Sequence, residues 1–191
     1  MASKVEICNR ALQKLGAKRI TSLTDANSVS AKAMNLAYEP VKKALLRAHP
    51  WSFAIARAEL AADASAPDWG RANAFQLPSD YLRLADDYEE DGVNDRDWEI
   101  EGSKIYTDDS DPIYIRYVKD VTDPNDFDPL FAEALSTRLA LETCEELTQS
   151  NSKKEGLIAD EKKIISEARR ANAIERRPKK SVEDTWVTCR N

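Results

Sequence analysis

Hydrophobic residues near the N-terminus recur every three to four positions, as they do on one face of an α-helix. The first such stripe consists of Val5, Cys8, Leu12 and Leu15. Ser3 and Glu6 match a helix capping box, and Gly16 suits the left-handed conformation that ends many helices. We therefore expect a first helix that begins after Ser3 and ends at Gly16.

A second stripe follows the polar segment 21–28. It consists of Ala31, Met34, Tyr38, Val41 and Leu45. Pro40 lies within this stripe and should kink the helix, because proline removes one backbone hydrogen bond. Pro50 restricts the backbone of His49. The second helix should therefore stop near His49.

Two further stripes lie in the C-terminal half. Asp128 and Pro129 provide an N-cap and a proline at the first helical position. The third stripe consists of Leu130, Ala134, Leu141, Cys144 and Leu147. Ser152 and Glu155 repeat the capping box and should open the fourth helix, whose stripe consists of Leu157, Ile158, Ile164, Ile165 and Ala168. Because each helix has one apolar face, we predict a four-helix bundle formed by residues 1–50 and 128–175.

The pattern changes after residue 50. Trp51, Phe53 and Ile55 lie two positions apart, which is typical of one face of a strand. Short alternating runs follow at 81–84, 98–100, 104–106 and 113–118, and Gly102 with Ser103 forms a hairpin signal. We predict a small antiparallel β module at 51–127, inserted into the helical bundle, and hence an α+β fold. The structural joint between the two parts is assigned to His49, Pro50, Trp51 and Phe53.

Composition narrows the functional classes. The formal charge of −6 and a pI near 5.0 argue against a protein whose main task is to grip nucleic acid. No apolar run is long enough to span a membrane, and the polar start predicts no signal peptide. The three cysteines are an odd number and scattered, which fits a reducing compartment, and Cys8 and Cys144 are expected as buried small hydrophobes.

Charge is unevenly distributed along the chain. Residues 80–111 contain thirteen acidic and three basic residues, whereas residues 162–180 contain eight basic and two acidic residues. A solvated acidic module beside a basic end would explain this without any function, and different partners at the two ends would explain it as well. Residues 176–191 form an extended tail in this prediction, and its candidate partner-binding residues are Arg176, Arg177, Lys179, Lys180, Trp186 and Val187.

Catalytic and metal-binding patterns are weak. His49 is the only histidine, no CxxC pair is present, and no glycine-rich turn could hold a phosphate. The acidic stretch 86–99 starts like a calcium-binding loop, but the position of the bidentate carboxylate is occupied by Trp98. We therefore predict no enzyme, no cofactor and no metal.

The order of several motifs resembles a known family. The chain contains Ala48-His49-Pro50-Trp51-Ser52-Phe53-Ala54 and, later, Phe75-Gln76-Leu77-Pro78-Ser79-Asp80-Tyr81. Together with the opening Glu6-Ile7-Cys8-Asn9-Arg10-Ala11-Leu12, this order resembles the tail tubular protein A family of short-tailed phages. The likeness extends over most of the chain and fades after about residue 175.

This resemblance implies a structural function. Members of that family are head-to-tail adaptors that form a ring, usually of twelve subunits, between the portal protein and the tail nozzle protein. The resemblance implies a virion protein at the head-tail junction that lets double-stranded DNA pass without binding it specifically, and whose C-terminal segment extends toward the portal. No contact with a membrane is expected either, because the longest apolar runs of the chain are too short to span one.

Two alternatives remain open on the sequence. One is a DNA-contacting or generic interaction module that uses the basic C-terminal segment. The other is a cell-wall hydrolase that acts through a pair of carboxylates such as Glu89 and Glu99.

Overall fold

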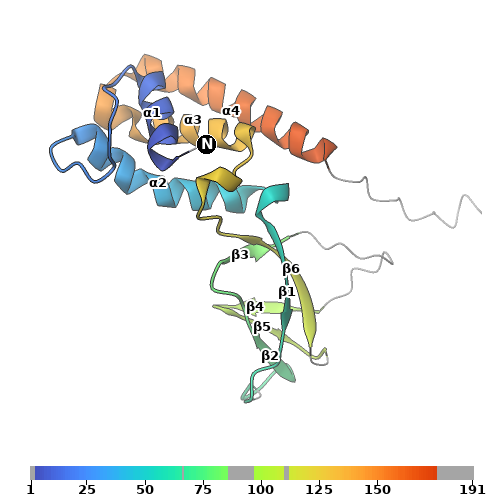
Figure 1. The fold of residues 1–191 in the computed structure, drawn as a ribbon. Helices are drawn as coiled ribbons and strands as arrows, with labels where there is room; N and C mark the ends of the chain where they lie inside the picture. The colour runs from blue at the N-terminus through green and yellow to red at the C-terminus, as the bar shows by residue number, and fades with distance from the viewer. Residues whose placement is uncertain (1–2, 66, 86–96, 110–111, 176–191) are drawn as a thin grey trace, which may run out of the picture.

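The computed structural model of this 191-residue chain describes residues 3–65, 67–85, 97–109 and 112–175. These residues form an α+β fold with a helical body at one end and a β module at the other (Figure 1). The α-helices are α1 (Lys4–Leu15), α2 (Val29–Ala48), α3 (Pro129–Thr148) and α4 (Asn151–Ile174). The strands are β1 (Ile55–Leu60), β2 (Asn73–Gln76), β3 (Tyr81–Leu84), β4 (Glu99–Glu101), β5 (Lys104–Thr107) and β6 (Ile113–Lys119).

The helix ends follow the capping chemistry of the sequence. The hydroxyl of Ser3 accepts a hydrogen bond from the amide of Glu6, and Gly16 takes a left-handed φ of 67°. The carboxylate of Asp128 caps α3. These predictions are confirmed, but the cap predicted at Ser152 is wrong. The N-cap of α4 is Ser150, because α3 ends in a left-handed residue directly before it and the chain turns at once into the next helix.

Helix α2 continues through Pro40 from Val29 to Ala48. Tyr38 and Val41, on either side of the proline, are both buried in the same core. Tertiary packing on both sides of Pro40 therefore holds α2 together as one helix.

The helices are organised around α3. Helices α1, α2 and α4 each make their main interhelical contacts with α3 and few with one another. The helices share one hydrophobic core, whose large buried side chains include Leu12, Met34, Trp51, Phe131 and Leu135. Helix α3 is consequently buried on several sides.

The strands of the predicted antiparallel β module form two sheets. Their strand orders are β1-β6-β3 and β2-β5-β4, and all pairs are antiparallel. Glu101 pairs with Lys104, so the predicted two-residue hairpin is confirmed, with Gly102 at φ 58°. The sheets pack face to face through a second core that includes Phe75, Ile105 and Ile115.

The prediction that Trp51 and Phe53 start a strand is wrong. Ser52–Ala54 form a short 3-10 helix, η1, and the first strand begins only at Ile55. A second short 3-10 helix, η2 (Pro124–Asp126), lies between β6 and α3. The two-residue spacing of the aromatic residues is misleading, because both rings pack into the helical core instead of onto one face of a sheet.

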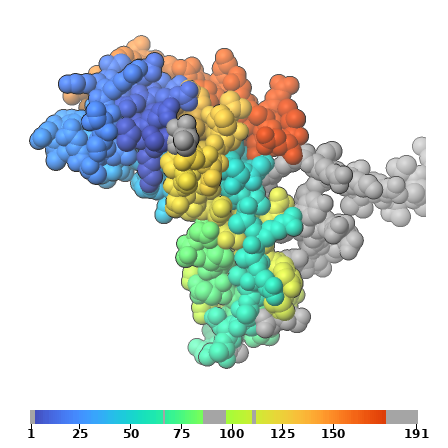
Figure 2. All heavy atoms as spheres, viewed as in Figure 1, coloured from blue at the N-terminus to red at the C-terminus, as the bar shows by residue number. Residues whose placement is uncertain are grey.

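The β module projects from the helical body (Figure 2). Strands β1 and β6 pair along their whole length and run from the helices toward the far end of the module (Figure 1). The chain therefore has an elongated shape with surfaces at two ends.

Candidate interaction site

The joint residues lie where the helical body meets the β module. Trp51 is only 1% exposed, and its indole nitrogen donates a hydrogen bond of 3.0 Å to the carbonyl oxygen of Leu45. Its ring packs edge-on against His49 and Phe131, with ring centres 4.8 and 5.2 Å apart. Phe53 also contacts Phe131. These contacts fasten the start of β1 to the end of α2 and to the central helix.

Asn172 of α4 completes the joint. Its side-chain oxygen accepts hydrogen bonds of 2.7 Å from both the amide and the hydroxyl of Ser52. Its side-chain nitrogen lies 2.9 Å from Nε2 of His49. Asn172 follows Ala168 by four residues and so occupies an apolar-stripe position of α4, and it is not among the site residues predicted from the sequence. A polar residue at a stripe position was the available signal.

A buried ion network links α2 to the end of β6. The ammonium group of Lys42 is 1% exposed and lies 2.8 Å from carboxylate oxygens of both Asp120 and Glu39. Burial disfavours the charged form of Lys42, but the hydrogen bonds that its ammonium group donates to these carboxylates outweigh burial and raise the pKa of Lys42 above its ordinary value. The guanidinium group of Arg47 adds a hydrogen bond to the carbonyl oxygen of Leu82 in β3. The two parts are thus held by buried polar contacts as well as by packing.

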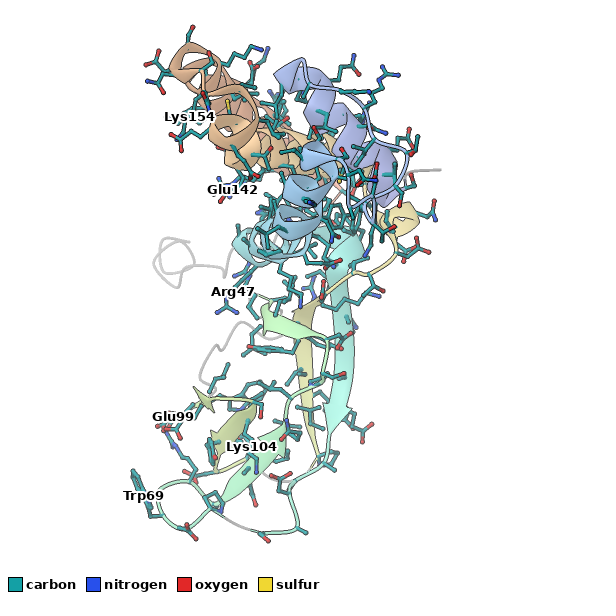
Figure 3. All side chains as sticks on the ribbon, turned by 90° about the vertical axis from the view of Figure 1, so that its left-hand side faces the viewer. Arg47, Trp69, Glu99, Lys104, Glu142 and Lys154 are labelled. Carbon is teal, nitrogen blue, oxygen red and sulfur yellow. The ribbon has the colours of Figure 1, made fainter. Side chains whose placement is uncertain are left out.

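The far end of the β module carries an exposed tryptophan. Trp69 is 88% exposed and extends from the loop between β1 and β2 (Figure 3). Two residues on, Arg71 forms ion pairs with the carboxylates of Asp97, Glu99 and Asp108. The hydrogen bonds that the guanidinium group donates to these three carboxylates raise the pKa of Arg71 further above its already high ordinary value. We call Trp69 and this ion cluster the tip.

Further bonds order the tip. The backbone amide of Ala72 donates a 2.8 Å hydrogen bond to Asp108, and the indole nitrogen of Trp98 donates a bond of 2.6 Å to Asp109. The hydrogen bond from Ala72 and the neighbouring Arg71 lower the pKa of Asp108. An exposed aromatic side chain therefore stands on an ordered, acidic loop.

A shallow groove of about 410 Å³ lies along α3 and α4. Its lining includes Arg138 and Glu161, which form an ion pair across the two helices. Arg138 neutralises the buried carboxylate of Glu161, so these two charged side chains already satisfy one another.

The described part of the chain gives little support to a catalytic carboxylate pair or to a metal site. Glu99 lies in exposed strand β4 and is ion-paired with Arg71, while Glu89 is outside the described residues. Among the residues that the structure describes, no group of histidine, cysteine or acidic side chains could hold a metal ion. Cys8 and Cys144 are free and buried, as predicted, and burial raises the pKa of the Cys8 thiol to about 12.

The predicted tail site cannot be compared with the structure. Its six residues, Arg176, Arg177, Lys179, Lys180, Trp186 and Val187, lie outside the described residues. Within the described ranges, no helix is both long and apolar enough to cross a membrane.

Comparison with other proteins adds no assignment. No model of a known protein family matches the chain. No curated protein sequence matches it either.

Proposed function

We propose that this protein is a non-enzymatic adaptor subunit of a phage virion, which joins the portal to the tail nozzle as part of a homo-oligomeric ring, usually of twelve copies. The order of the His49-Pro50-Trp51 and Leu77-Pro78-Ser79 motifs supports this function by resemblance. The structural observation that carries it is the exposed Trp69 on the ordered tip, at the opposite end from the helical body.

An adaptor needs separate contact surfaces and a firm connection between them. Trp69 exposes a large apolar area, and a tryptophan at the centre of an interface typically contributes about 2 kcal/mol or more. Its loop is already ordered by Arg71 and Asp108, so a partner would not have to order it on binding. We assign the tip to the nozzle contact, because the resemblance gives the portal contact to the C-terminal segment 176–191.

The helical body has a supporting part in this proposal. We propose that α1 to α4 act as a four-helix bundle unit that keeps its shape while the ring forms. The buried contacts of Trp51, Asn172 and Lys42 would transmit load between this unit and the β module without bending at the joint.

The charge of the chain agrees with a DNA conduit. A subunit with a formal charge of −6, repeated around a ring, repels the phosphates of passing DNA and disfavours tight binding to the wall. The duplex could then slide through during ejection.

The experiment is reconstitution with the portal protein and nozzle protein of the same phage, imaged by cryo-electron microscopy. A ring of this chain seated coaxially between portal and nozzle is expected. The Trp69→Ala variant should still dock on the portal but lose nozzle binding, whereas Leu36→Ala, which removes a similarly exposed side chain from α2, should lose neither. No ring on the portal under any salt condition would overturn the proposal.

A further inference from the structure

The groove between α3 and α4 carries positive charge that its own chain does not balance. Its lining consists of Arg138, Glu161, Lys162, Ile165, Ser166 and Arg169. The charges of Arg138 and Glu161 cancel in their ion pair. The side chains of Lys162 and Arg169 are exposed, and neither forms an ion pair among the described residues. The groove therefore keeps a formal charge of +2 from two unpaired cations.

The two unpaired cations lie on either side of an apolar contact point. Lys162 and Arg169 are seven residues apart on α4, which places them on one side of the helix, about 10 Å from each other along its axis. Ile165 lies between them and is half-buried, because it also packs against the helical core. Carboxylates with an apolar side chain beside them would suit this arrangement.

Residues 123–130, which we call the acidic turn, have the matching chemistry. Asp123, Asp126 and Asp128 give the turn a formal charge of −3, and none of them forms an ion pair among the residues that the structure describes. Leu130 follows them and is 36% exposed. Because Asp123 caps η2 and Asp128 caps α3, the turn is already ordered and a partner would not have to order it.

The groove and the acidic turn lie on opposite sides of the helical body. Arg138 of the groove precedes Glu142 by one helical turn on α3, and Glu142 lies on the left side of the body in Figure 3. The yellow segment with η2 lies on the right side in the same view. The two surfaces of one chain therefore cannot meet each other, and each is available to another chain.

We propose that the groove of one copy binds the acidic turn of a second copy of this chain. The two surfaces are opposite in charge, and each adds an exposed or half-buried apolar side chain, Ile165 in the groove and Leu130 in the turn. A contact between two different surfaces of identical chains is heterologous, and its repetition closes a ring when the rotation allows it. This inference rests on the proposed function for the ring, and it names the residues that join neighbouring subunits.

Nucleic acid suits the groove less well than the acidic turn does. A duplex is a long polyanion, so the formal charge of −6 on the whole chain opposes its binding. The apolar side chain of Ile165 also offers no hydrogen bond to a phosphate. A short acidic turn, in contrast, is influenced mainly by the cations next to it, because salt screens more distant charges.

Charge exchange tests the contact on the full chain. Arg169→Glu and Asp126→Lys, both at exposed positions, should each weaken self-association by about tenfold, measured by analytical ultracentrifugation at low salt. The double variant Arg169→Glu with Asp126→Lys should restore association, because every interface then contains the reversed pair. The matched controls are Arg170→Glu, one residue along α4 and outside the groove, and Asp68→Lys in the tip loop, which should have little effect. Unchanged association in the two single variants would overturn the proposal.

A cross-link in the wild-type chain tests proximity directly. Isotopically labelled and unlabelled chains are mixed and treated with a carbodiimide, which joins the amine of a lysine to a carboxylate in contact with it. Mixed-isotope cross-links from Lys162 to Asp126 or Asp128 are expected in mass spectra, whereas the neighbouring exposed Lys163, outside the groove, should give none to these aspartates. Coupling of Lys162 only to carboxylates of its own chain would overturn the proposal. So would a wild-type chain that stays monomeric at millimolar concentration and on portal rings.

The outcomes separate this contact from the adaptor function. Rings that dock on the portal but lack the cross-link would retain the adaptor and overturn the contact. Open filaments with the cross-link, and no portal docking, would retain the contact and overturn the adaptor. Binding of a short DNA duplex that Arg169→Glu weakens, without effect on self-association, would overturn the contact and assign the groove to nucleic acid instead.

Discussion

The joint and the tip use the same residue types for opposite purposes. Trp51 is 1% exposed and holds two parts of the chain together, whereas Trp69 is 88% exposed and touches little of its own chain. Lys42 is a cation 1% exposed between two carboxylates, whereas Arg71 is a cation 20% exposed among three carboxylates that are themselves largely in solvent. The difference teaches that burial decides whether such a residue stabilises the fold or remains available to a partner.

The largest expected effect is at Trp51. Trp51→Ala should lower the free energy of unfolding by about 3 to 5 kcal/mol, because it leaves a cavity beside Phe131 and removes the bond to Leu45. Urea denaturation measures this. Trp51→Phe should cost clearly less, since it keeps most of the packing. An equal cost for Trp51→Ala and Trp69→Ala would abolish the contrast between joint and tip.

The second-largest loss of stability is expected in the buried ion network of Lys42, Glu39 and Asp120. Asp120→Asn leaves the buried ammonium group of Lys42 with Glu39 as its remaining carboxylate, so we expect a loss of about 1 to 3 kcal/mol in unfolding free energy. Thermal and urea unfolding provide the measurement. The exposed Asp68 of the tip loop is the matched control, and Asp68→Asn should change stability very little. Equal behaviour of the two variants would show that the network adds nothing.

Removing the side-chain amide of Asn172 should lower the free energy of unfolding by a smaller amount. Asn172→Ala removes the acceptor for the amide and hydroxyl of Ser52, which should cost about 1 to 2 kcal/mol. Hydrogen exchange at the amide of Ser52 should also become faster. Glu167→Ala on the exposed side of α4 is the control. Unaltered protection of Ser52 would remove Asn172 from the joint.

We expect the free energy of unfolding to depend modestly on acidic pH through the ionisation of Glu39. Burial opposes ionisation of Glu39, but hydrogen bonds from Lys4 and Lys42 outweigh it and lower its pKa. Its contribution to stability is therefore present above the ordinary carboxyl pKa and is lost as pH falls through the lowered value. Denaturation between pH 7 and pH 3 should show a smaller acid-induced loss for Glu39→Gln than for wild type, with Glu142→Gln as control. An identical pH slope in all three chains would contradict this assignment.

The smallest effect on stability belongs to the tip. Trp69→Ala should change the free energy of unfolding by no more than about 0.5 kcal/mol, because the side chain is almost wholly in solvent. Urea denaturation checks this, and the nozzle-binding experiment measures the same variant for function. A destabilisation of several kcal/mol would mean that Trp69 belongs to the fold rather than to an interface.

Predictions from the sequence are accurate where a feature is decided by neighbouring residues in the chain. The caps at Ser3 and Asp128 and the hairpin at Gly102 were predictable, since each rests on neighbouring residues only. The spacing of Trp51 and Phe53 fits a strand, yet the ring of Trp51 is buried in the helical core and the partly buried ring of Phe53 packs against that core. The spacing of hydrophobic residues along the chain does not show which other part of the protein they will pack against.

The candidate sites were predicted less well than the fold. The acidic excess around residues 80–111 was evident, but the clustering of Asp97, Glu99 and Asp108 around Arg71 depends on the pairing of strands distant in sequence. Asn172 was recognisable only as a polar residue in an apolar stripe. Trp69 gave no periodic signal, because an exposed loop has none.

The α+β class, the positions of the four helices and most strand segments can be predicted from the sequence, because turn, cap and periodicity preferences act within a few residues. The tertiary structure alone decided that α3 is central, that the strands divide into two packed sheets, and which tryptophan is buried. The strand register also places Arg57, Arg83 and Arg116 on the same face of the sheet β1-β6-β3. These features arise from contacts between residues far apart in the chain, and the free energy of such contacts is defined only once the whole core has assembled.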